Sequence, residues 1–179
     1  MITDQIEIVC KNTGSRHYVE PGRDLLALAN EIGVKLRYPI LGAMVNNRLR
    51  DLRFKVFMPI TIEFIDITHA AGMRMYVRSL FFLLQKAVRD AMPSCRLRVN
   101  HSVSRGYYCE IAGFKKALEY PFIFDLVERM KQIVARNVPF EPRATLTADA
   151  IEIFTRQGDL EKVRLLESRP RLYTTLYGL

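Results

Sequence analysis

Hydrophobic and polar residues alternate near the start of the chain in the way that paired strands require. Ile6, Ile8 and Cys10 fall on one face of an extended segment. A turn-forming stretch follows at 12–15, and the alternation resumes at 17–19. This pattern predicts a β-hairpin.

One helix and three further extended segments follow the hairpin. Leu25, Leu28 and Ile32 recur at helical spacing, which predicts an amphipathic helix that ends at Gly33. The extended segments cover 41–45, 49–52 and 60–65, with a turn at Asn46 and Asn47. A hairpin, one helix and short closing strands predict a small α+β roll over residues 1–66, with the helix across a mixed sheet.

Longer helices dominate the pattern in the second part of the chain. Residues 66–72 lose all periodicity and are interpreted as a linker. Apolar residues then keep to one side of a helix that Pro93 ends. The elements predicted after the linker are a helix at 73–92, strands at 97–99 and 107–111, and an amphipathic helix at 122–137.

Two short helices and a strand are expected at the end of the sequence. Thr147 and Asp159 are each predicted to cap a short helix. Residues 173–179 alternate as a strand without an evident partner, so we expect that the polypeptide continues or that this strand joins an existing sheet. These elements predict a second, truncated α+β domain over 73–179.

Composition excludes several classes of protein. The chain has 179 residues, of which 49% are hydrophobic and 26% charged, which is enough for one or two buried cores. Its longest apolar stretches are too short to span a bilayer, and no secretory signal is present at the N-terminus, so a cytoplasmic protein without a membrane partner is expected. Three widely spaced cysteines predict reduced thiols.

The net charge of +8 makes anionic partners plausible, and the charge is uneven. Residues 1–66 carry 9 basic and 8 acidic groups (+1), whereas residues 67–179 carry 18 and 11 (+7). Basic and aromatic side chains are interleaved in one stretch, as phosphate contact and base stacking require. Its members are Arg96, Arg98, Arg105, Tyr107, Tyr108, Lys115 and Lys116. The same pattern also suits an ordinary solvated sheet face, so both interpretations stay open.

Other chemistry finds little support in the sequence. The histidines His17, His69 and His101 are too scattered to predict a metal site. A nucleophilic pair of Cys109 with His101 is conceivable, but a small buried thiol is the favoured interpretation. None of the nine glycines is followed by lysine, so no phosphate-binding loop of the Walker type is present. We therefore predict no catalytic residue and no cofactor in this chain.

The order of segments resembles two known domains. The stretch Ala43-Met-Val-Asn-Asn-Arg-Leu-Arg-Asp-Leu52 is similar to a recurring turn of TGS domains, which are ubiquitin-like β-grasp units. The remainder resembles the second, editing-domain-like region of threonyl-tRNA synthetases, on the segments 105–111, 128–131 and 152–163. The resemblance covers essentially the whole chain and implies a TGS domain at 1–66 and a synthetase-like domain at 73–179.

One departure from that family bears directly on function. The synthetases carry His-Ser-x-x-His on the long helix, where two imidazoles help to hydrolyse mischarged tRNA. The matching stretch here is Arg78-Ser-Leu-Phe-Phe82, without either histidine. Hydrolysis of aminoacyl esters is therefore not expected. By analogy with the family, Arg78 and Ser79 are candidate ligand contacts in a groove beside Tyr108 and Arg105.

A two-domain front without an editing site also resembles the N-terminal part of bacterial uridine-kinase-like nucleoside kinases. That resemblance implies a parent kinase that uses ATP and magnesium, with this chain as its binding or regulatory module. The partners would be RNA, a nucleotide or the kinase domain of the same polypeptide, and an oligomer is conceivable. The alternative is a stand-alone RNA- or tRNA-binding protein related to threonyl-tRNA synthetases.

Overall fold

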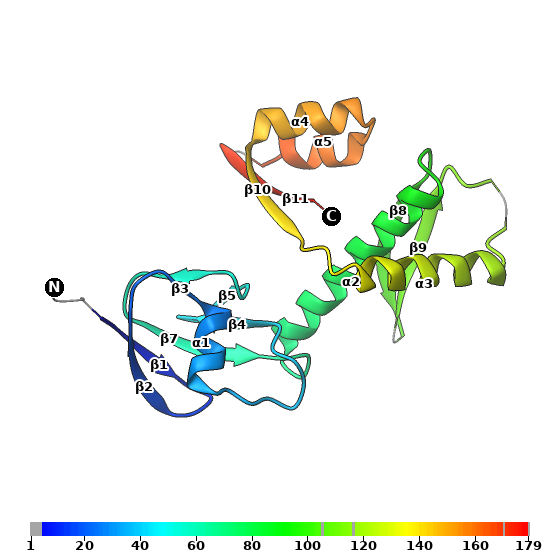
Figure 1. The fold of residues 1–179 in the computed structure, drawn as a ribbon. Helices are drawn as coiled ribbons and strands as arrows, with labels where there is room; N and C mark the ends of the chain where they lie inside the picture. Colours follow the sequence, from blue (N-terminus) through cyan, green and yellow to red (C-terminus); the bar gives the residue numbers. More distant parts are fainter. Residues whose placement is uncertain (1–4, 105, 116, 170, 179) are drawn as a thin grey trace. The chain divides into compact units, whose positions relative to one another are not determined.

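The computed structural model describes residues 5–104, 106–115, 117–169 and 171–178 (Figure 1). The fold is α+β, as the sequence predicted, and it divides into two compact units, Met1–Leu83 and Leu84–Leu179. The boundary between the units falls within helix α2 (Ala70–Ala91).

The start of α2 corrects the predicted linker over 66–72. The helix begins at Ala70 because polar side chains before it bind backbone N–H groups of its first turn and of the approach to it. Asp66 accepts from the backbone N–H of Thr68 at 2.8 Å, and Nδ1 of His69 accepts from that of Ala71 at 3.1 Å. Asp66 and His69 therefore mark the start of the helix, which the pattern of apolar residues does not show.

The first unit is a five-stranded mixed sheet with one helix on it. Its strands are β1 (Ile6–Cys10), β2 (Ser15–Val19), β4 (Gly42–Val45), β5 (Arg48–Arg50) and β7 (Ile60–Ile65). They lie in the order β2-β1-β7-β4-β5, with a parallel pair β1–β7 at the centre and antiparallel pairs elsewhere. This is the β-grasp arrangement, and the hairpin, turn and closing strand predicted from the sequence are confirmed.

Helix α1 (Leu25–Ile32) crosses one face of that sheet, as Figure 1 shows. Asp24 caps it by accepting from the N–H of Ala27 at 2.8 Å, and Gly33 ends it at φ 71°, where glycine meets no steric penalty. Leu25 and Leu28 are fully buried against the strands. A short ladder of β3 (Arg23–Asp24) with β6 (Lys55–Val56), which the sequence did not reveal, precedes the helix.

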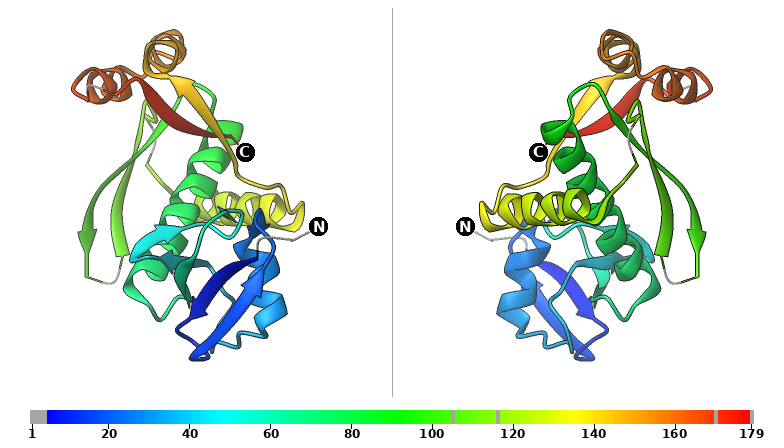
Figure 2. Two further views of the ribbon diagram at one scale, coloured as in Figure 1. Left: turned by 90° about the vertical axis from the view of Figure 1, so that its left-hand side faces the viewer. Right: turned by 90° about the vertical axis from the view of Figure 1, so that its right-hand side faces the viewer.

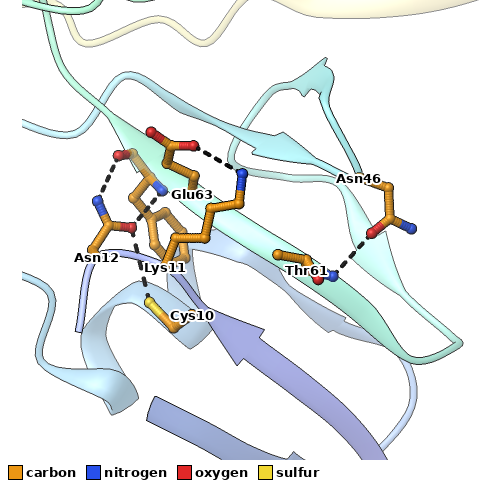
Figure 3. A network of polar contacts seen from close by, with 7 residues as sticks. Cys10, Lys11, Asn12, Asn46, Thr61 and Glu63 are labelled. Atoms are coloured by element: carbon orange, nitrogen blue, oxygen red, sulfur yellow. Dashed lines mark hydrogen bonds and ion pairs between the residues drawn. The ribbon is translucent and has the colours of Figure 1, made fainter. Parts of the chain in front are cut away.

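Two asparagines extend the pairing of the central strand β7 beyond its ladders (Figure 3). The Asn12 amide accepts from the N–H of Phe64 at 2.7 Å and donates to its carbonyl at 2.9 Å, so it acts like one more residue of β1. Asn46, at φ 46° in the turn after β4, accepts from the N–H of Thr61 at 2.9 Å. Asparagine tolerates this left-handed backbone better than most residues, which explains the turn chemistry.

The second unit packs a hairpin and a helix against the end of α2. The hairpin consists of β8 (Arg96–Val103) and β9 (Gly106–Ala112), and the helix is α3 (Tyr120–Ala135). Ala87 and Val88 of α2 and Leu126 of α3 form its buried core, with Leu97 and Ile111 packed against them. The predicted strands and both predicted helices are therefore present. The strands and α2 are longer than predicted, and α3 has the predicted length but begins two residues earlier.

The last part of the chain forms a two-stranded sheet with two helices. Its elements are β10 (Glu141–Leu146), α4 (Thr147–Arg156), α5 (Leu160–Glu167) and β11 (Tyr173–Gly178). Strand β11 pairs antiparallel with β10, which the sequence did not predict, so the final strand joins a sheet within the chain. Figure 2 shows α4 and α5 side by side over these strands.

The predicted helix caps in this part are confirmed only for α5. Asp159 caps it, and its side chain accepts from the N–H of Lys162. Thr147 is not a cap, because β10 runs straight into α4 and leaves Leu146 at the cap position. The Thr147 hydroxyl instead donates to the carbonyl of Arg171 at 2.6 Å, which fastens α4 to the segment directly before β11.

No helix within the described residues is both long enough and apolar enough to cross a membrane.

Candidate nucleic-acid interface

The β8–β9 hairpin carries most of the candidate residues. Arg96 and Arg98 alternate with half-buried Leu97 and Val99, so the arginines lie on the face turned away from the core of α2 and α3. Both arginine side chains are exposed. Two further candidates, Arg105 and Lys116, lie outside the described residues.

The two tyrosines of β9 lie on opposite faces of the hairpin. The register pairs Arg98 with Glu110, and alternation places Tyr108 on that same face and Tyr107 on the other. Both rings are about half exposed, at 48% for Tyr107 and 51% for Tyr108. The ring of Tyr108 lies 5.5 Å from that of His101, across the irregularity in the ladder between Val99 and Ser102. Although Tyr107 and Tyr108 are adjacent in the sequence, their rings do not form a single stacking surface.

Both arginines of β8 already have partners within the second unit. The Arg96 guanidinium donates to the carbonyl oxygens of Gln157 and Gly158, where α4 ends. Arg98 forms an ion pair of 2.7 Å with Glu161 in the first turn of α5. These contacts join the hairpin to the helix pair, so the arginines have a structural role whether or not they also contact a ligand.

The charge around Asp159 reflects that arrangement. Partial burial by itself raises the pKa of its carboxyl, but hydrogen bonds from Lys162, the charge of Lys162 and that of Arg96 outweigh it and lower the pKa below its ordinary value. Lys162 also lies over the ring of Phe154 at 4.8 Å. The sequence alone gives little sign that Arg96 and Lys162 lie near Asp159. The one signal is Gly158, which marks the end of a helix and therefore a place where backbone carbonyls need donors.

The remaining candidates belong to other elements of the chain. Lys115 is exposed in the segment after β9. Arg78 is exposed on α2 in the first unit, and the Ser79 hydroxyl donates to the carbonyl of Met75 at 3.1 Å. The expected groove would combine Arg78 and Ser79 with Tyr108 of the second unit, and it stays a prediction.

The thiol at Cys109 is poorly suited to nucleophilic chemistry. Burial raises its pKa, which lowers the fraction of reactive thiolate. Its proposed partner His101 instead contacts Tyr108. Among the described residues, no three His, Cys, Asp or Glu side chains gather in a group that could hold a metal ion.

Comparison with known proteins points to one class of enzyme. No family model matches the chain. It is 25% identical over 155 residues to the threonine–tRNA ligase of Francisella tularensis subsp. novicida (strain U112), which covers 87% of this chain and 24% of that protein. It is also 25% identical over 169 residues to the threonine–tRNA ligase of Desulforamulus reducens, covering 92% of this chain and 26% of the relative.

The chain is similar to threonine–tRNA ligases over most of its length. It spans about a quarter of the length of these relatives. The synthetase-like part of the predicted resemblance is therefore supported, at a low level of identity. The predicted nucleoside-kinase parent receives no support from these relatives.

Proposed function

We propose that this chain is an RNA-binding module related to threonyl-tRNA synthetases, with tRNA as its ligand and the cytoplasm as its location. The observation that carries the proposal is the similarity to threonine–tRNA ligases over 87% of the chain. Those relatives act on tRNA by their name, and the net charge of +8 favours an anionic ligand. An RNA- or tRNA-binding protein, the alternative given in the sequence analysis, is thus preferred to a regulatory module of a kinase. ATP and magnesium, which belong to the kinase interpretation, stay predictions.

Binding without hydrolysis is the activity that the residues of α2 support. Arg78 and Phe82 occupy the positions at which the resemblance places two histidines. Neither side chain can exchange a proton near neutral pH, and phenylalanine cannot bind a metal ion. The module is therefore proposed to hold tRNA or to position it, and not to cleave an aminoacyl ester.

Aromatic stacking is the contact that the second unit is best equipped to make. Tyr107 and Tyr108 present half-exposed rings on a hairpin, and Lys115 adds an exposed charge nearby in sequence. Stacking of a base on an aromatic side chain contributes roughly 1–3 kcal/mol. Since Arg96 and Arg98 already hold α4 and α5, we assign the tyrosines the larger part in ligand contact.

Fluorescence anisotropy of a labelled tRNA tests the proposal. The wild-type chain should bind at low salt and lose affinity as salt rises, and Tyr108→Ala should weaken binding about tenfold. The matched control is Tyr18→Ala, which removes a 64% exposed tyrosine from β2 of the first unit and should leave binding unchanged. Failure of the wild-type chain to bind tRNA at about 0.05 M salt, where phosphate contacts are strongest, would overturn the proposal.

A further inference from the structure

Seven of the eleven basic residues of the first unit form two groups that differ in their partners. Three basic side chains, one directly after β1 and one each on β2 and β3, each pair with a carboxylate. The pairs are Lys11 with Glu63 at 3.4 Å, Arg16 with Glu7 at 2.9 Å, and Arg23 with Glu31. These cations are neutralised locally, so they contribute little to the field beyond the surface.

The second group lies at residues 48–55, called here the basic edge. This segment holds Arg48, Arg50, Arg53 and Lys55 against one acidic residue, Asp51, for a net charge of +3 in eight residues. Within the described residues, the one carboxylate contact of this group is Arg53 with Asp51, at 4.0 Å. That carboxylate also accepts from the backbone N–H of Arg53 at 2.8 Å, so it is held within the turn.

The fold orders these cations along one border of the sheet. Strand β5 is the last strand, next to β4 alone, and Arg48 and Arg50 occupy alternate positions on it. The Arg50 guanidinium lies 4.8 Å from the ring centroid of Phe54. Stacking on a ring fixes the side chain while its N–H groups remain able to donate.

The segment after β5 is equally fixed by the helix that it borders. The N–H groups of Leu25 and Leu26 donate to the carbonyls of Phe54 and Leu52 at 3.1 and 3.0 Å. Leu52 and Phe54 therefore face the core, and the alternate residues Arg53 and Lys55 are exposed. On the extended strand β5, the alternate residues Arg48 and Arg50 are spaced about 6.6 Å apart, which is the scale of successive phosphates on a nucleic-acid strand. Arg53 lies in the turn that follows, in which the N–H of Phe54 donates to the carbonyl of Asp51 at 3.1 Å.

We propose that the basic edge is a phosphate-binding surface of the first unit, which contacts the RNA backbone without reading its sequence. This inference rests on the proposed function and adds to it a second contact surface, remote in sequence from the β8–β9 hairpin. A net charge of +3 on a segment whose backbone is held by β4 and α1, with one carboxylate contact at 4.0 Å, suits sequence-independent phosphate contact. Charged residues on an edge strand also discourage aggregation, and the experiment must distinguish this role from phosphate binding.

A double charge reversal of the full chain, Arg48→Glu with Arg53→Glu, tests this inference. Its matched control is Lys11→Glu with Arg16→Glu, which changes the net charge by the same amount at paired sites. Binding of labelled tRNA is measured over a series of salt concentrations. The basic-edge variant should bind at least tenfold more weakly at about 0.1 M salt, with a log–log salt slope shallower by roughly 1.5. The control should keep most of the affinity.

Each outcome separates the inference from its alternatives. Equal losses of affinity in both variants would mean that only the total charge matters. An unchanged affinity of Arg48→Glu/Arg53→Glu would leave protection of the sheet edge from aggregation as the role of these residues. Either result overturns the inference while the proposed function stands. Failure of the wild-type chain to bind tRNA would overturn both. The variant Arg48→Lys/Arg53→Lys keeps the charges and should keep the affinity within about threefold, which guards against a loss caused by misfolding.

Discussion

The guanidinium of Arg98 lies 2.7 Å from the carboxylate of Glu161, and this ion pair joins strand β8 to the first turn of α5. Together with the bonds from Arg96 to the end of α4, it uses two residues of the predicted RNA-binding cluster to assemble the second unit. Part of the predicted basic surface is therefore used in contacts within the unit, because charged side chains can also bind the unpaired backbone groups and the dipoles at helix ends.

Arg96 and Arg98 should differ in their contribution to stability. Arg96→Ala removes two charge-assisted hydrogen bonds to carbonyls and should lower the free energy of unfolding by about 1–2 kcal/mol. Arg98→Ala breaks an ion pair whose side chains are 46% and 67% exposed, and should cost less than about 1 kcal/mol. Urea unfolding of the full chain measures both, with Arg89→Ala, an exposed residue of α2, as the control. Equal, negligible effects of all three would contradict the structural role of Arg96.

Gly72 should tolerate no side chain. A Cβ at this position would lie 1.9 Å from the carbonyl oxygen of Asp66, which is backbone and cannot swing aside. Alanine in an exposed helix usually stabilises relative to glycine, yet Gly72→Ala should destabilise by at least about 2 kcal/mol. Thermal unfolding tests this against Gly106→Ala, where the nearest atom would be 3.8 Å away. A stabilised Gly72→Ala would disprove the close approach.

Asp66 should make stability depend on acid pH. Hydrogen bonds from the Thr68 hydroxyl and backbone N–H, and from the N–H of Tyr38, favour the carboxylate and lower its pKa below the ordinary value. Because the folded pKa is lower than the unfolded one, its contribution is fully present above the unfolded pKa of about 3.9 and disappears as pH falls through the folded pKa.

The comparison that isolates this effect is wild type against Asp66→Asn in urea unfolding between pH 2 and 6. The variant should be less stable at pH 6, and the difference should shrink as the wild-type carboxylate becomes protonated. A difference independent of pH would mean that the geometry of the amide, and not the charge, causes the loss.

Asn12 should contribute strongly to the stability of the first unit. Asn12→Ala leaves both the N–H and the carbonyl of Phe64 without this partner, and a lost partner for a buried backbone group costs about 1–3 kcal/mol. Thr13→Ala, one residue further in the same turn, is the control, since its hydroxyl contacts that of Ser15 within the turn and not the backbone of β7. Chemical denaturation compares the two, and an Asn12→Ala variant as stable as Thr13→Ala would show that water replaces the amide.

Local pattern was a reliable guide where side chains near in sequence decide the outcome. The alternation of Ile6, Ile8 and Cys10 fixed the face of β1, and Gly33 ended α1 as expected. It failed for β10, whose Glu141 and Pro142 show no alternation of apolar residues. That strand exists because β11, far along the chain, supplies its hydrogen bonds.

The candidate site divides in the same way. Composition and spacing identified Tyr107, Tyr108 and Lys115 as candidate ligand contacts; the structure shows that all three are exposed, and ligand contact stays a prediction. They did not reveal that the arginines of β8 meet α4 and α5. Nor did they reveal that, among the described residues, the four cations at 48–55 share one carboxylate contact, Arg53 with Asp51, while Lys11 and Arg16 each have a partner.

The sequence by itself determined most of the elements, their order and the α+β class, since these follow from periodicity and turn residues within short windows. The exceptions are the short β3–β6 ladder and β10. Only the tertiary structure decided which charges are neutralised. A salt bridge depends on the distance between residues remote in the chain, such as Arg98 and Glu161, and that distance is set by packing. The charged surface that stays open to an anionic ligand is therefore a property of the fold and cannot be obtained from counting charges.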